Sequence, residues 1–105
     1  MMNGRLVLIV SLWLKDVNVA QFETFEREAA RRMAKYGGRI ERAIRLDDSS
    51  RMEDHPFEIH VVSFPDESSF AAYQEDPDAR RLASSRSKLI ANSVVLFGRD
   101  IEVYA

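Results

Sequence analysis

Glu58 and His60 are the residues of this sequence whose types and spacing suit proton chemistry. They lie in the hydrophobic run PFEIHVVSF, residues 56–64, which has the composition of a β-strand. Because alternate residues of a strand share a face, the carboxylate and the imidazole should point the same way. Imidazole titrates near neutral pH, so His60 is a candidate catalytic acid or base. The alternative is a structural role, in which the pair forms hydrogen bonds across a subunit interface or with arginines.

Strand alternation predicts which side chains surround this pair. The leucine-rich face of the first strand should pack on helices, which leaves Ser11 and Trp13 on the other face of the sheet. We expect the third strand to place Phe57, Ile59 and Val61 toward the helices. Its remaining residues should then face away from the helices, with an arginine of the second strand beside them: Glu58, His60, Val62 and Phe64, opposite some of Arg39, Glu41, Arg42 and Arg45.

These placements define a candidate ligand pocket. A guanidinium binds a carboxylate through two parallel hydrogen bonds, which makes Arg39 and Arg42 candidate ligand contacts. Arg39 also has a structural interpretation, because it enters a strand directly after a tight turn. The predicted ligand is a small aromatic or carboxylated metabolite. The predicted ligand-binding residues are Trp13, Arg39, Arg42, Glu58 and His60, with His60 as the catalytic candidate.

The composition argues against several other chemistries. The chain has no cysteine, which excludes disulfides, a thiolate nucleophile and cysteine-ligated metals. The only histidines, His55 and His60, have neither the helical nor the strand spacing of a paired metal site, so we expect no metal. No glycine-rich nucleotide loop is present, and we expect no cofactor.

Charge and hydropathy argue against nucleic acid and membrane partners. The net charge is −2, and residues 56–64 lack the glycines of the RNA-recognition pattern and carry an acidic residue instead. An RNA-binding module is therefore a disfavoured alternative. The apolar N-terminal run is interrupted by Ser11 and is better explained as a β-strand than as a signal peptide. No apolar run approaches the ~20 residues that cross a bilayer, and we expect a cytoplasmic protein.

The elements that position these residues form a single predicted domain over residues 1–105. Residues 5–15 are apolar on both strand faces, which is typical of an interior strand. Asn18 is a good N-cap for a helix whose apolar stripe follows steps of three and four residues and ends at Gly37. A more polar strand over 39–46 should lie at a sheet edge, and 57–64 should form a second interior strand.

The second helical region is predicted to be broken. Asp66 can cap a short helix, and the sequence Asp76-Pro77 should end it, because the residue before a proline is disfavoured in helices. Pro77 suits the first turn of a new helix over 77–92, and 93–105 should form a strand bent at Gly98. The order β-α-β-β-α-β predicts an α+β ferredoxin-like fold, with a four-stranded antiparallel sheet and both helical regions on one face.

Two helices leave one sheet face uncovered, although the first and third strands are apolar on both faces. Such a patch is larger than soluble monomers usually expose, so a second copy of the chain is expected to cover it. The element order, the helix ending AKYGGR and the segment VVSFPDESSFAAYQEDPDAR resemble the dimeric α/β-barrel superfamily, especially its small branch of unknown function. The resemblance implies a homodimer with a small-molecule cavity, distantly related to antibiotic-biosynthesis-type monooxygenases, haem-degrading monooxygenases and muconolactone-isomerase-like enzymes.

The function expected from these features is small-molecule binding. The resemblance implies a cofactor-free monooxygenase-like or isomerase-like enzyme as one form of it. A ligand-sensing or structural dimerisation module without catalysis is the other, and no residue pattern decides between them.

Overall fold

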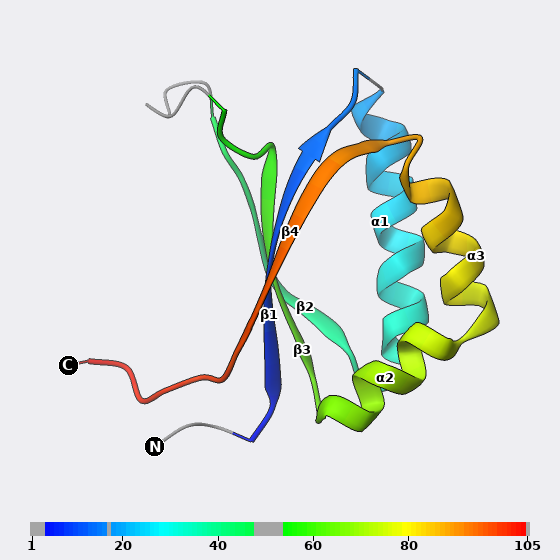
Figure 1. The fold of residues 1–105 in the computed structure, drawn as a ribbon. Coiled ribbons are helices and arrows are strands. Elements are labelled where there is room, and N and C mark those ends of the chain that lie inside the picture. The colour runs from blue at the N-terminus through cyan, green and yellow to red at the C-terminus, as the bar shows by residue number, and fades with distance from the viewer. Residues whose placement is uncertain (1–3, 17, 48–53, 105) are drawn as a thin grey trace.

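The computed structural model describes residues 4–16, 18–47 and 54–104. The sheet has the strand order β2-β3-β1-β4, every neighbouring pair is antiparallel, and the helices cover one face (Figure 1). The predicted ferredoxin-like α+β fold is confirmed, including the edge position of β2 and the central positions of β1 and β3. In chain order the elements are β1 Leu6–Leu14, α1 Val19–Ala34, β2 Arg39–Arg45, β3 Glu58–Phe64, α2 Glu67–Glu75, α3 Pro77–Arg86 and β4 Ile90–Gly98.

Helix α1 has the ends that the sequence predicts. The side chain of Asn18 accepts a hydrogen bond from the backbone N–H of Ala20 at 2.7 Å. At the other end, Gly37 has φ 74°, and the N–H of Gly38 donates to the carbonyl of Met33 at 2.9 Å. This is a Schellman motif, in which glycine takes the left-handed conformation at low cost. It directs the chain from the helix straight into β2.

The break at Asp76-Pro77 is also confirmed. Helix α2 ends at Glu75, and Asp76 is extended, with φ −63° and ψ 128°. Its carboxylate caps α3 by accepting the N–H groups of Asp78 and Ala79 at 2.8 and 3.1 Å. Two short helices rather than one long helix therefore cover the sheet beside α1.

Helix α3 is shorter than predicted. It ends at Arg86, and β4 already begins at Ile90, where residues up to 92 were expected to be helical. Ile90 is buried in a cluster with Leu12 and Phe22. The apolar spacing around residues 89–90 is compatible with either a helix or a strand. Ile90 pairs with Leu14 on β1, so this segment is a strand.

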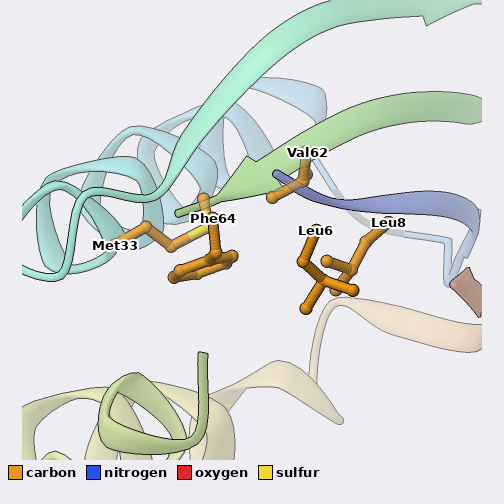
Figure 2. Close-up of a cluster of buried hydrophobic side chains, with 5 residues drawn as sticks. All are labelled: Leu6, Leu8, Met33, Val62 and Phe64. Atoms are coloured by element: carbon orange, nitrogen blue, oxygen red, sulfur yellow. The ribbon is translucent and has the colours of Figure 1, made fainter. Parts of the chain in front are cut away.

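The core lies between the sheet and the helices. Figure 2 shows one part of it, where Met33 of α1 reaches toward Phe64 while Leu6 and Leu8 lie beside Val62. The leucine-rich face of β1 therefore packs on the helices, as expected. Among the described residues, no helix is both long and apolar enough to cross a membrane.

The predicted orientation of β3 is wrong. Leu8 lies directly opposite Val62, and Val10 opposite His60, so the even-numbered residues of both strands share the helix-facing side. Phe57 does pack on Phe22, at 5.9 Å between ring centroids, but the chain bends there and the regular strand begins only at Glu58. Counting the alternation from Phe57 therefore assigns every later side chain to the wrong face.

Candidate functional site

Glu58 and His60 are in direct contact. Their shared strand face is confirmed, and the Nε2 of His60 lies 2.5 Å from the Oε2 of Glu58. Both residues are buried, with exposed fractions of 7% for Glu58 and 4% for His60. A carboxylate only accepts hydrogen bonds, so Nε2 is the donor, and in the neutral form of the imidazole the lone pair lies on Nδ1.

Arg45 balances the charge of Glu58. It lies opposite Glu58 in the β2–β3 ladder, and its Nη2 and Nε donate to Oε1 of Glu58 at 2.8 and 3.0 Å. The guanidinium also stacks over the Phe57 ring at 4.7 Å from its centroid. Hydrogen bonds from Arg45 on one oxygen and from His60 on the other fix the orientation of the carboxylate.

Glu26 of α1 lies on the other side of the imidazole. Its Oε2 is 3.8 Å from the Nδ1 of His60. Burial raises the pKa of the Glu26 carboxyl above its ordinary value of 4.5, and the charges of His60 and Arg86 offset this only in part. His60 is therefore flanked by two carboxyl groups, and Arg45 pairs with only one of them.

His60 and Glu26 both line a cavity of about 530 Å³ between the sheet and the helices. Most of its wall is apolar, from all four strands and all three helices. The volume is that of a typical small-molecule pocket. Its polar lining residues are Glu26, His60, Tyr73, Gln74, Arg80 and Arg86.

The structure separates the other predicted ligand residues from His60. Arg39 lies opposite Ser63 and Arg42 opposite Val61, which places both arginines on the sheet face away from the helices. Trp13 is on that face too, and its Nε1 donates to the backbone carbonyl of Asp54 at 3.2 Å. The prediction of one cavity shared by these three residues with Glu58 and His60 is therefore wrong. Ligand binding by Trp13, Arg39 or Arg42 stays a prediction.

Sequence reasoning missed Glu26 and Arg86 at this site, and it did not single out Arg45 as the partner of Glu58. Glu26 follows Phe22 by four residues and precedes Ala29 by three, so its place at the border of the apolar stripe was a usable signal. Arg45 was one of four residues considered opposite the pair. Arg86 had no local signal, because only the packing of α3 brings it to the cavity wall.

Within residues 4–16, 18–47 and 54–104, no three His, Cys, Asp or Glu side chains are arranged to hold a metal ion.

The sheet face away from the helices carries exposed apolar side chains. Leu96 of β4 lies opposite Ile9 of β1, and their exposed fractions are 61% and 37%. In the next row across the sheet, Val94 and Ile44 are also exposed, at 41% and 38%. We call this surface the open face, and define it by Ile9, Ile44, Val94 and Leu96.

The sequence matches no protein-family model and no curated protein. Among solved structures, a protein of unknown function from Rhodopseudomonas palustris superposes with a TM-score of 0.80 at 13% identity, covering 95% of this chain and 85% of that one. A variant of SnoaB from Streptomyces nogalater, described as a cofactor-independent oxygenase, gives a TM-score of 0.73 at 14% identity over 96% and 97% of the two chains. A dimeric protein of unknown function from Bacteroides fragilis gives 0.61 at 12% identity over 95% and 100%. At these identities the comparisons establish the fold, which is the ferredoxin-like fold shared by these proteins.

Proposed function

We propose that this chain is an enzyme that binds a small, largely apolar ring compound in the helix-side cavity and removes a proton from it with His60. The observation that carries the proposal is the 2.5 Å contact between Nε2 of His60 and Glu58, at the wall of a cavity of about 530 Å³. A buried histidine held by a carboxylate is the usual arrangement of a general base.

Glu58 and His60 have different roles in this proposal. Glu58 accepts the Nε2 hydrogen, fixes the ring and stabilises the imidazolium that forms when Nδ1 takes a proton. Nδ1 is the nitrogen on the side of Glu26, which itself lines the cavity. Arg45 keeps Glu58 oriented from the β2 side, so the imidazole is already positioned before the ligand binds.

Arg86, the last residue of α3, supplies a positive charge on the helix side of the cavity. Among the described residues it forms no ion pair within 4.0 Å, in contrast to Arg45 and Arg32. A ligand carboxylate, or the oxygen that becomes negative when a neighbouring C–H bond is deprotonated, would bind favourably there. This favours an aromatic or carboxylated compound with an ionisable hydrogen.

The neighbours support cofactor-free chemistry in this fold. SnoaB is described as a cofactor-independent oxygenase. Removal of a proton from a hydroxyaromatic or carbonyl compound yields an electron-rich anion, which is the entry to either oxygenase or isomerase chemistry. A ligand sensor that lacks catalysis remains the competing function.

The proposed assembly is a homodimer formed through the open face. The helices leave one side of the sheet uncovered (Figure 1), and the strand register places these exposed apolar side chains on that side. A protein with this fold from Bacteroides fragilis is described as dimeric. Association of two open faces would remove this apolar surface from water, the dominant favourable term in protein association.

The proton-abstraction step is tested with 2-tetralone, an aromatic-fused ketone with exchangeable α-hydrogens. The protein in D2O should accelerate loss of the α-hydrogen NMR signals, and His60→Gln should reduce this acceleration at least ~10-fold. His55→Gln is the matched control, because His55 lies outside the cavity, and it should keep the rate. Binding of 2-tetralone with no exchange, or exchange at the wild-type rate in His60→Gln, would contradict the enzymatic proposal.

A further inference from the structure

Glu26 is the carboxyl group of this site that the proposed base does not require. Glu58 already orients His60, and Arg45 bridges Glu58 and Glu23 without an ion pair to Glu26. Glu26 comes from α1 rather than from the sheet, and its side chain is only 18% exposed. Burying a carboxyl group without a contacting cation costs folding free energy, so its presence here calls for a functional explanation.

The charged and titratable groups around Glu26 come from three other elements. His60 of β3 is nearest, at 3.8 Å from Nδ1 to Oε2, and Glu58 lies behind it. Arg86 of α3 lowers the pKa of Glu26, whereas desolvation, the largest effect, raises it. Tyr73 of α2 also lines the cavity, and burial raises the pKa of its phenol, with the charge of Glu26 adding to the effect. Glu26 thus retains a proton more readily than an exposed carboxyl group does.

Two groups that exchange protons therefore line the same cavity, His60 from the sheet and Glu26 from α1. In the neutral imidazole Nδ1 carries a lone pair, and the Glu26 carboxyl can carry a hydrogen. Nδ1 of His60 and Oε2 of Glu26 are 3.8 Å apart, which is longer than a direct hydrogen bond. Both atoms can therefore contact neighbouring atoms of one bound molecule.

We propose that Glu26 is a second catalytic residue, and that the reaction is a proton shift between two carbon atoms of an enolisable, unsaturated carbonyl compound. This inference rests on the proposed function of His60. His60 removes a proton from the carbon beside the carbonyl, and the C–H electron pair forms the C=C bond of a dienolate whose oxygen carries the negative charge. The carboxyl of Glu26 then gives its hydrogen to the γ-carbon, and the carbonyl re-forms as the C=C bond moves into conjugation. The proton on His60 passes to Glu26, so the substrate and product are isomers and no oxidant or reductant is consumed.

The test uses 3-cyclohexen-1-one, whose isomerisation to 2-cyclohexen-1-one is followed by ultraviolet absorbance. Exchange of its α-hydrogens in D2O is measured in parallel by NMR. Wild-type protein should catalyse both reactions. Glu26→Gln keeps the size and shape of the side chain but cannot transfer a proton, and it should slow isomerisation at least ~10-fold while α-exchange continues. Glu28→Gln, on the same helix but outside the cavity, should behave as the wild type.

The two proposals fail in different ways. No α-exchange by wild-type protein, or equal exchange by His60→Gln, would overturn the function of His60. Exchange without formation of the conjugated ketone, or isomerisation by Glu26→Gln at the wild-type rate, would overturn the role of Glu26 alone. An equal loss of both reactions in Glu26→Gln would assign it a structural role and also overturn the inference; thermal unfolding of the variant would then show the loss of stability.

Discussion

Arg45 lies directly opposite Glu58 across the β2–β3 ladder and donates two hydrogen bonds to the same carboxylate oxygen, at 2.8 and 3.0 Å. The other oxygen of Glu58 is thereby left for His60. The Arg45–Glu58 pair joins the sheet edge to the buried imidazole. Its register consequently controls both the stability of β2 at the edge and the orientation of the proposed base.

We expect Arg45→Met to destabilise the protein by about 1–3 kcal/mol, because it leaves the Glu58 carboxylate buried without its cation. The effect should be smaller than for a fully buried pair, since the Arg45 side chain is 42% exposed and water screens part of the interaction. Urea unfolding measures the change. In a Glu58→Gln background the same substitution should cost less, and an equal cost in both backgrounds would show that Arg45 acts by packing alone.

The register of this pair also shows where sequence reasoning stops. The presence of the four strands, α1 with its caps, and the break at Asp76-Pro77 follow from local residue chemistry, and the structure confirms them. The bounds of the last strand are an exception: it was expected over 93–105, but β4 spans Ile90–Gly98 and ends where a bend was predicted. The bulge between Ile40 and Arg42 does not follow from local chemistry. It shifts the alternation of β2 by one residue and places Arg45, rather than Arg42, on the side of Glu58.

The orientation of β3 was predicted wrongly for the same reason: local residue chemistry does not determine it. Both faces of this strand carry apolar residues, so the pattern fits either orientation equally well. The bend at Phe57 and the pairing of Val62 with Leu8 select one of them. Contacts between residues far apart in the chain, such as Glu26 with His60, depend on that choice and were not accessible from the sequence.

The free energy of unfolding should depend on the protonation of Glu26. Folding raises the pKa of this carboxyl above 4.5, so the folded protein binds the proton more tightly than the unfolded chain does. The favourable contribution is complete below pH 4.5 and is lost as the pH rises through the folded-state pKa. We therefore expect Glu26→Gln to be more stable than the wild type at pH 7.5, with little difference at pH 4.

Urea unfolding of both proteins at the two pH values measures this dependence. His60, Glu58 and Arg86 are present in both, so subtraction isolates Glu26. A Glu26→Gln variant that is less stable than the wild type at pH 7.5, but equal to it at pH 4, would show that the site stabilises the charged carboxylate instead.

The open face should determine the oligomeric state. Light scattering of the wild type at micromolar concentration should give about twice the chain mass of 12.1 kDa. Leu96→Asp should give a single-chain mass while the protein stays folded, because this side chain is already 61% exposed in the isolated chain but would become a buried charge in the dimer. Ala71→Asp is the matched control, since Ala71 is exposed on α2, a helix on the other side of the sheet, and it should remain dimeric. A wild type that scatters as a single chain would contradict dimerisation, and a Leu96→Asp protein that stays dimeric and folded would place the interface elsewhere.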